Sequence, residues 1–370
     1  MKGVSSLFAR QIKMSEENEK MARDQHRVLG ISDSLGEELR SPGNAWFFEG
    51  GLLGLFIHFG ISTVRGEGDL FWGMIDATPS DALSGGNYTI TPREYWEQAK
   101  SFNPEKYDPD NWLRAAKEAG FTYAVFTTRH HDGFSMWPSD YGSLNTKNFM
   151  KGRDLVREYV DACRRNGLRV GLYYSPPDWY VERYCRSFYW TSWEPDKYPD
   201  AKPGGLDHEE IDEVPAMPPA LLADYRRYIS DQIRELLTKY GKIDVLWFDG
   251  GLPDLDGMIP MEEIISLQPD IAVNDRIYGR GYHSGYECSL PEEKPPQFFE
   301  HCDIWMENCG WAHMNRCTGY RSAEWLYEKY KKVRDWGGNV LIDVGPRADG
   351  TLPEIYYRRM AEFKELLERA

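Results

Sequence analysis

The sequence predicts an α/β fold, and a closed barrel of parallel strands and helices rather than an open sheet. Short apolar runs alternate with amphipathic stretches from about residue 46 onward. Runs that are nearly all apolar suit strands buried on both faces, as in a parallel sheet. No GxGxxG follows the first run and no GxxxxGKS/T occurs, so nucleotide-binding open sheets lose support. The 370 residues would allow two or three average domains, but they also suit one (β/α)8 barrel.

The apolar runs are expected to form strands, and longer amphipathic stretches between them are expected to form helices. The expected strands span residues 52–59, 123–128, 169–175, 243–248, 271–274, 304–306 and 339–344. The expected helices span residues 109–119, 152–166 and 220–240, and each is followed by a glycine, which is a helix stop signal.

Two segments fall outside this alternation. The first 45 residues are polar and charged, with a weak helical pattern, and they predict an N-terminal extension. Residues 189–219 are rich in Pro, Asp, Glu and Gly, and they are too long for an ordinary connection between a strand and a helix. We expect this second segment to form either a surface excursion or a lid over a site.

The charge and hydropathy exclude several classes of partner. The chain has 44 Lys+Arg against 59 Asp+Glu, a net charge of −15. No nucleic acid partner is expected, because binding phosphates requires an excess of cations, and an anionic membrane surface is disfavoured for the same reason. No apolar run is long enough for a transmembrane helix or for the core of a secretory signal. We therefore expect a cytoplasmic protein, or a secreted or periplasmic one if the N-terminus was trimmed.

Polar side chains gather at one end of the expected strands. In an α/β barrel, functional groups lie at the carboxyl ends of the strands and in the loops that follow. Chance would place charged residues at both ends. The residues at these ends are His58, Arg129, His130, His131, Asp132, Tyr173, Tyr174, Ser175, Asp249, Asn274, Asp275, Arg276 and Glu307.

Asp249 is the sharpest of these features, because it ends an otherwise apolar strand and is followed by two glycines. An aspartate at an arbitrary strand end is more often a helix cap or an ion-pair partner. The alternative is a nucleophile or general base in a partly desolvated pocket. Trp247 favours this alternative, since an aromatic ring beside a reactive carboxylate suits the apolar face of a sugar.

The adjacent His130 and His131 raise the question of a metal. Neighbouring residues on a strand point in opposite directions, and no third ligand follows at a recognisable spacing. For these two histidines, hydrogen bonding to a polyhydroxylated ligand is therefore favoured over metal binding. The remaining alternative is that they have a purely structural role. His58 is as consistent with a core histidine as with a pocket residue.

The cysteines give little support to a metal site either. Six cysteines are too few for a disulfide scaffold in a chain of this length. Four of them cluster without a CxxC pair, so buried thiols are favoured over structural zinc. These four are Cys288, Cys302, Cys309 and Cys317.

Several motifs together resemble one family. They are LGLFIHFG (53–60), AGFTY (119–123), RHHDGFSMW (129–137), GLYYS (171–175), WFDG (247–250), NDR (274–276) and GGNVLIDVGP (337–346). In this order they are similar to the retaining α-L-fucosidases of glycoside hydrolase family 29, across residues 46–353. The resemblance implies a distorted (β/α)8-like barrel over residues 46–370, as a single domain without the family's usual C-terminal β-sandwich.

The resemblance also implies roles for individual residues. Asp249 corresponds to the catalytic nucleophile. The implied substrate-binding set is His58, His130, His131, Tyr174, Trp247 and Arg276, and Trp72 is a further candidate for the pocket wall. No metal and no organic cofactor is implied.

The implied mechanism requires a second carboxyl group, about 5–5.5 Å from the nucleophile, that acts first as acid and then as base. Glu287 and Glu307 are the two candidates, and Glu287 is preferred. The implied partner is a fucosylated glycan or oligosaccharide. Many barrels of this family associate, which makes a homo-oligomer a further expectation.

The sequence also departs from the family pattern. Phe71 stands where many members have a glutamate that contacts the sugar hydroxyls. Either Glu67 or Asp69 replaces that glutamate, or the pocket accepts a related sugar such as L-galactose. An α-L-galactosidase, a catalytically silent sugar-binding barrel and a metal-dependent hydrolase using His130 and His131 remain alternatives.

Overall fold

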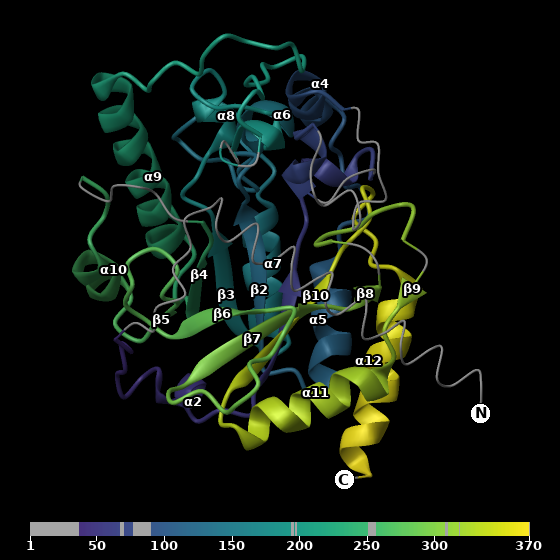
Figure 1. Ribbon diagram of the computed structural model, residues 1–370. Helices are drawn as coiled ribbons and strands as arrows, with labels where there is room; N and C mark the ends of the chain where they lie inside the picture. The colour runs from purple at the N-terminus through teal and green to yellow at the C-terminus, as the bar shows by residue number, and fades with distance from the viewer. Residues whose placement is uncertain are drawn as a thin grey trace.

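A single sheet of eight parallel strands organises the molecule (Figure 1). The computed structural model describes residues 37–66, 70–76, 90–193, 196, 198–250, 257–307, 310–317 and 319–369. The strand order is β5-β4-β3-β2-β1-β10-β7-β6. The strands are β1 (Leu53–Ile57), β2 (Tyr123–Arg129), β3 (Arg169–Tyr174), β4 (Val245–Phe248), β5 (Ala272–Val273), β6 (His283–Glu287), β7 (Phe299–Ile304) and β10 (Asn339–Val344).

The sheet curls until its two edge strands meet. An isolated parallel bridge joins Asn274, directly after β5, to Tyr282, directly before β6. Tyr282 N donates to Val273 O at 2.9 Å. Gly281 makes this approach possible: it has a φ of +127°, and a Cβ atom there would lie 2.2 Å from Val273 O. The expected (β/α)8-like barrel is therefore confirmed.

Helices cover the outside of the barrel (Figure 1). The three helices expected from the sequence are confirmed as α5 (Pro109–Glu118), α7 (Leu155–Arg165) and α9 (Pro219–Lys239). Asp108 and Asp154 cap the first two by accepting backbone N–H groups of the first turn. The other α-helices of the described residues are α2 (Ala45–Phe48), α4 (Pro92–Glu97), α6 (Thr146–Phe149), α8 (Trp179–Glu182), α10 (Met261–Leu267), α11 (Ala323–Asp335) and α12 (Glu354–Glu368).

The barrel is distorted on one side. Within residues 257–307, all of which the structure describes, no helix separates β5 from β6 or β6 from β7. The strand expected at 304–306 is wrong, because β7 ends at Ile304 and Met306–Glu307 form β8, which pairs with β9 (Gly319–Tyr320) in a hairpin. The sequence obscured β7 because Glu300, His301 and Asp303 are buried on it together with apolar residues.

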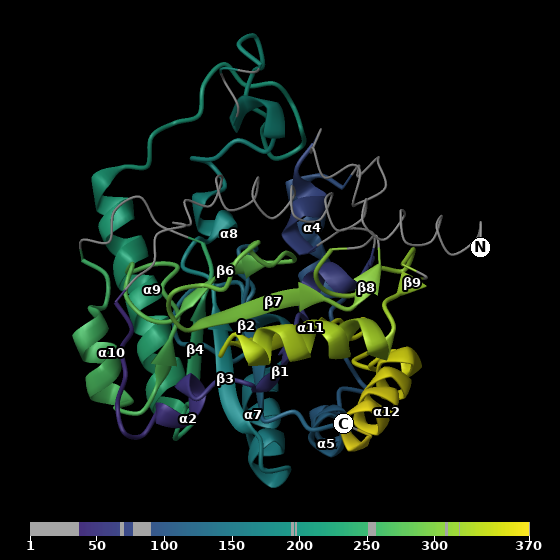
Figure 2. The same ribbon diagram turned by 60° about the horizontal axis from the view of Figure 1, so that its bottom comes forward.

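The segment between α8 and α9 rises away from the barrel (Figure 2). Its described residues include a short 3-10 helix, Trp190–Trp193, and an isolated bridge between Gly204 and Glu210. The segment also touches the loop after β1, because His208 Nε2 lies 2.8 Å from Met74 O. It is thus a surface excursion that borders the loop carrying Trp72, and its role as a lid stays a prediction.

The N-terminal extension lies mostly outside the described residues, as do Glu67 and Asp69. Its described end joins the barrel, because the Asn44 side chain donates to Ile271 O at 3.1 Å. In the described part of the chain, no helix has the length and apolar character of a membrane span. The cytoplasmic location stays a prediction.

Candidate active site

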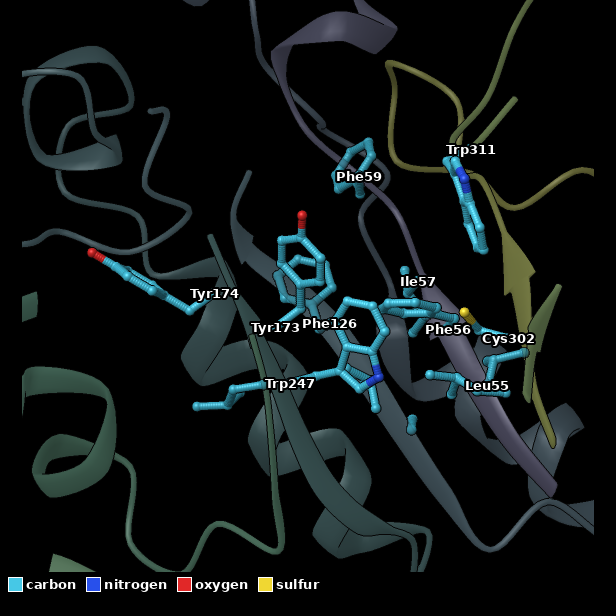
Figure 3. Close-up of a cluster of buried hydrophobic side chains, with 14 of the residues drawn as sticks. Leu55, Phe56, Ile57, Phe59, Phe126, Tyr173, Tyr174, Trp247, Cys302 and Trp311 are labelled. Atoms are coloured by element: carbon cyan, nitrogen blue, oxygen red, sulfur yellow. The ribbon is translucent and has the colours of Figure 1, made fainter. Parts of the chain in front are cut away.

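A pocket opens at the carboxyl ends of the strands, among their last residues and the loops that follow. It holds about 390 Å3 of empty space, its open mouth included. Figure 3 shows four of the lining residues, Phe56, Tyr173, Trp247 and Trp311, within a cluster of buried side chains. The lining residues are Phe56, His58, Leu70, Phe71, Trp72, His130, His131, Tyr173, Trp247, Asp249, Arg276, Glu287 and Trp311.

Asp249 lies at the end of β4, whose residues are all buried, and its side chain remains 12% exposed toward the pocket. Tyr173 Oη donates to Asp249 Oδ2 at 2.7 Å, and the backbone N–H of Gly250 donates to Oδ1 at 3.0 Å. Gly250 has a φ of +74°, and a Cβ atom there would lie 2.8 Å from Pro177 Cγ. The glycine after Asp249 is therefore required by both conformation and space.

Arg276 joins two carboxylates. Its Nη1 donates to Asp249 Oδ1 at 2.7 Å, and its Nη2 donates to Glu287 Oε2 at 2.8 Å. The Arg276 side chain is only 2% exposed, and Ser284 O accepts from Nη2 at 2.9 Å. Burial alone would lower the pKa of Arg276, but the carboxylates of Glu287 and Asp249 outweigh it and raise that pKa. A permanent cation therefore holds both carboxylates in one pocket.

The two candidates for the second carboxyl group lie in different places. Glu287 ends β6, lines the pocket and has a side chain 8% exposed. Glu307 lies in the β8–β9 hairpin, where it pairs with Gly319, and it is not among the residues that line the pocket. The structure thus brings Glu287, and not Glu307, into the pocket with Asp249.

His130 and His131 present opposite hydrogen-bonding characters to the pocket. The backbone N–H of His131 donates to His130 Nδ1 at 2.9 Å, so the proton of a neutral His130 ring belongs on Nε2. His131 Nδ1 contacts Ser175 Oγ, whose own proton goes to Pro177 O, so this network leaves His131 Nε2 as an acceptor. His131 Nε2 has no hydrogen-bond partner among the described residues and lies 3.6 Å from Asp249 Oδ2.

Both rings are neutral at physiological pH, because burial holds the pKa of each well below its ordinary value. Neighbouring rings and cations add to this effect. One neutral ring that donates and one that accepts can together bind the hydroxyl groups of a polar, uncharged ligand.

His58 is held by a residue that sequence reasoning did not single out. Its Nδ1 lies 2.8 Å from Asp343 Oδ1, on the neighbouring strand β10, and both side chains are almost fully buried. Burial raises the pKa of Asp343, although the contact with His58 opposes the shift. Asp343 therefore orients the His58 ring through Nδ1, and Nε2 is the other ring atom that can form a hydrogen bond.

Aromatic side chains form most of the pocket wall. The Trp247 ring stacks on Tyr173 with centroids 5.5 Å apart, and the Arg276 guanidinium lies 4.3 Å from the Trp247 ring. Phe71 packs on His130 with centroids 4.8 Å apart, and Trp72 lies beside Phe71. Such a wall suits the apolar face of a sugar ring better than it suits a charged ligand.

Tyr174 does not line the pocket, in contrast to the expectation from the sequence. Successive side chains of a strand point to opposite faces, so Tyr173 takes the inner position on β3. Tyr174 Oη donates to Gln232 Oε1 at 3.0 Å, and its ring lies against Arg129. Figure 3 shows Tyr174 pointing away from the other labelled rings. We therefore assign the pocket position to Tyr173.

Other residues of the site were also missed. Trp311 lies in a loop, and no periodicity indicated its position. Asp343 carried a usable signal, since it is the one charged residue in the expected strand at 339–344. Glu300, which accepts a hydrogen bond from Trp247 Nε1 at 2.8 Å, lies in a strand that the sequence did not predict.

Cysteines and metal ligands do not form a recognisable centre in the described part of the chain. There, no group of three or more His, Cys, Asp or Glu side chains could hold a metal ion. Cys288 and Cys302 are buried free thiols, as expected, but Cys317 is disulfide-bonded, so the expectation of a thiol is wrong there. Cys309 lies outside the described residues.

The fold and the site together define a class: a (β/α)8-like barrel whose polar pocket holds two carboxylates between aromatic walls. The family model for alpha-L-fucosidase matches residues 32–370. The chain belongs to the alpha-L-fucosidase family, glycoside hydrolase family 29.

Individual relatives agree with this assignment. The chain is 27% identical over 339 residues to tissue alpha-L-fucosidase of Bos taurus, which covers 86% of this chain and 66% of the relative. The chain thus spans about two thirds of the length of such curated relatives. Alpha-L-fucosidase isoenzyme 1 from Paenibacillus thiaminolyticus has a TM-score of 0.70 at 28% identity, covering 88% of this chain and 75% of that one.

A third relative shares the fold. The Bacteroides thetaiotaomicron alpha-L-fucosidase, solved as a trapped covalent intermediate, has a TM-score of 0.66 at 23% identity. The match covers 92% of this chain and 77% of that one.

Proposed function

We propose that the chain is a retaining exo-α-L-fucosidase, which hydrolyses terminal α-L-fucosyl residues of glycans by double displacement. One observation carries the proposal: Arg276 holds Asp249 and Glu287 in the same pocket. Retaining and inverting glycosidases both use such a pair of carboxyl groups. A relative from Bacteroides thetaiotaomicron was solved as a covalent intermediate with 2-fluoro-fucosyl fluoride, which supports the same chemistry here.

Asp249 is the proposed nucleophile. One of its carboxylate oxygens attacks the anomeric carbon, and the bond between that carbon and the leaving oxygen breaks. Tyr173 and Arg276 donate to the two oxygens of Asp249 and so fix the direction of attack. The proposed intermediate is a glycosyl ester of Asp249.

Glu287 is the proposed acid/base. It protonates the leaving oxygen in the first step, and in the second step it takes a proton from the water that attacks the anomeric carbon. Its position in the pocket supports this role over Glu307. Glu307 remains the alternative, because it lies in a hairpin beside residues outside the described part of the chain.

The sugar hydroxyls are proposed to bind the three histidines. His130 Nε2 can donate, and His131 Nε2 can accept, as the hydrogen-bond network assigns them. Phe71 and Trp72 offer an apolar surface that suits the C6 methyl group of fucose. L-Galactose carries a hydroxyl there, and apolar pockets reject an added hydroxyl only by about a hundredfold, so an α-L-galactosidase is the second candidate.

Release of para-nitrophenol from the α-L-fucoside tests the proposal. We expect turnover that EDTA does not reduce and that Asp249→Ala abolishes. The control variant is Asp335→Ala, because the Asp335 side chain is exposed on the surface. Asp275 is unsuitable as a control, because its carboxylate contacts the buried His283. Binding of fucose without turnover would show a silent barrel, loss on chelation would show a metal-dependent hydrolase, and faster release from the α-L-galactoside would change the assigned substrate.

Azide separates the two acid/base candidates. The correct variant, Glu287→Ala or Glu307→Ala, should keep the first step on an activated aryl fucoside and should be accelerated by azide. We expect this behaviour from Glu287→Ala. Acceleration only in Glu307→Ala would assign the acid/base role to Glu307.

The expected homo-oligomer stays a prediction.

A further inference from the structure

Glu300 lies inside the barrel below the pocket, with none of the residue exposed to solvent. Tyr123 Oη donates to its Oε2 at 2.6 Å. Trp247 Nε1 and Tyr282 Oη donate to its Oε1 at 2.8 Å and 3.3 Å. Tyr123 and Trp247 belong to β2 and β4, which are not neighbours of β7 in the sheet, so these bonds cross the barrel interior.

This carboxylate is costly to bury. All three of its hydrogen-bond donors are neutral, and no ion pair with Glu300 occurs among the described residues. Burial raises the pKa of Glu300 to about 7, although the bonds from Tyr123, Trp247 and Tyr282 oppose the shift. An apolar side chain would fill the same space at lower cost, so the contacts of Glu300 should explain its presence.

Trp247 is the contact that connects Glu300 to the pocket. An indole has a single hydrogen-bond donor and no acceptor, so the bond to Glu300 is the one hydrogen bond that Trp247 can donate, and it restrains rotation of the ring about the Cβ–Cγ bond. Figure 3 shows the nitrogen-bearing ring turned toward the side of Leu55 and Cys302, and Cys302 is two residues beyond Glu300 on β7.

The Trp247 ring in turn supports the groups that hold Asp249. Tyr173 stacks on it with an interplanar angle of 14°, and the Arg276 guanidinium lies 4.3 Å from its centroid. Both of these side chains donate to Asp249, at 2.7 Å each. A rotation of the indole would therefore displace the donors on either oxygen of Asp249.

We propose that Glu300 is a positioning residue for the reaction: it fixes the Trp247 indole, and through it the Tyr173 and Arg276 donors at Asp249. Glu300 touches neither substrate nor reacting atoms in this role. The inference rests on the proposed function, because it assigns a purpose to Trp247 in the pocket of that enzyme.

Three variants test the proposal by kinetics. Glu300→Leu removes the acceptor, and we expect kcat/KM on an aryl fucoside to fall at least about tenfold, mainly through kcat. Glu300→Gln keeps a carbonyl oxygen for the indole and offers its amide to Tyr123, so it should stay within about threefold of the wild type. Tyr123→Phe is the matched control, since it removes another bond to Glu300 and leaves the indole bond intact.

A merely structural role would give a different pattern. In that case Tyr123→Phe and Glu300→Leu would lower the melting temperature and leave kcat/KM within about threefold of the wild type, or would reduce it equally. Either result would overturn the proposal. A double-mutant cycle sharpens the test: with Trp247→Phe already in place, Glu300→Leu should cause no further loss beyond about threefold.

A spectroscopic readout separates this inference from the proposed function. The indole N–H signal of Trp247, assigned in protein labelled with 15N-tryptophan by its loss in Trp247→Phe, should shift in Glu300→Leu more than in Tyr123→Phe. If the signal shifts while the wild type cleaves no fucoside, the proposed function fails and the Glu300–Trp247 link stands. If the signal does not shift, the link itself is overturned.

Glu300→Leu could prevent folding, and Trp247→Phe then tests the same bond from its other side. This variant keeps a ring but removes the donor, and we expect the same loss of at least about tenfold in kcat/KM. Activity within about twofold of the wild type would overturn the proposal.

Discussion

The Nη1 atom of Arg276 donates to Asp249 Oδ1 at 2.7 Å, in a pocket where the guanidinium is 2% exposed. Its other terminal nitrogen binds Glu287, so the planar fork of one side chain sets the relation between both carboxylates. Lysine carries the same charge but has a single terminal nitrogen and cannot reproduce this geometry.

Arg276→Lys should therefore lower kcat/KM on an aryl fucoside by about a hundredfold, since it removes a preorganised donor beside the reacting group. Arg280→Lys is the matched control: this arginine is 41% exposed and pairs with Glu262 on the surface. Equal effects of the two substitutions would contradict the role that we assign to the Arg276 fork.

Tyr173 and Tyr174 form a natural pair for a second test. Tyr173→Phe removes the donor to Asp249 Oδ2, and we expect kcat to fall about tenfold, the effect of losing a hydrogen bond to a charged group. Tyr174→Phe removes only the bond to Gln232 on the other face of β3, so kcat and KM should be unchanged. The reverse result would restore Tyr174 as the pocket residue.

Asp343 should matter through His58. Asp343→Ala leaves the buried Nδ1 of His58 without its partner, and we expect a loss of about 1–3 kcal/mol in the free energy of unfolding, together with a higher KM. Asp343→Asn keeps an acceptor oxygen of similar shape and should recover most of the KM. Chemical denaturation and steady-state kinetics measure the two effects, and a KM unchanged in Asp343→Ala would separate His58 from substrate binding.

Glu300 should make stability depend on pH. Its folded-state pKa is about 7, because burial disfavours the charged form, whereas an unfolded glutamate titrates near its ordinary value of 4.5. The folded state thus binds the extra proton between these values. The stabilisation is complete below about pH 4.5 and is lost as the pH rises through about 7, a change on the order of 3 kcal/mol.

Comparison with Glu300→Gln isolates this contribution. The variant cannot titrate, so its free energy of unfolding relative to the wild type should rise between about pH 4.5 and pH 7. A difference between the two proteins that stays constant across this range would show that Glu300 keeps an ordinary pKa in the folded state.

The sequence predicted those parts of the fold in which hydropathy follows burial. The strand at 339–344 was predicted to the residue, since every side chain in Asn339–Val344 is buried and all but two are apolar. β6 was missed because His283–Glu287 is mostly polar. His283 pairs with Asp275, and Ser284 and Glu287 both accept hydrogen bonds from Arg276, so these side chains do not form an apolar core.

The site was predictable where a polar residue interrupts or ends an apolar strand, as at His58 and Asp249. Side-chain direction was predictable in principle from the alternation on β3, which places one of two adjacent tyrosines outward. The contact of Arg276 with both carboxylates could not be predicted from the sequence, because it depends on how the barrel closes between β5 and β6. A local sequence pattern does not predict which residues come into contact when the two edge strands of a sheet meet.

The side of the barrel without helices has an evolutionary consequence. Glu287 sits on a strand whose neighbours along the chain are reached through loops, and the connection from residue 288 to residue 298 packs no helix against the sheet. Doubling the length of such a loop costs only about 0.6 kcal/mol in closure entropy. Insertions and deletions can accumulate here without repacking the core, so the depth of the pocket can change while Asp249 keeps its place at the end of β4.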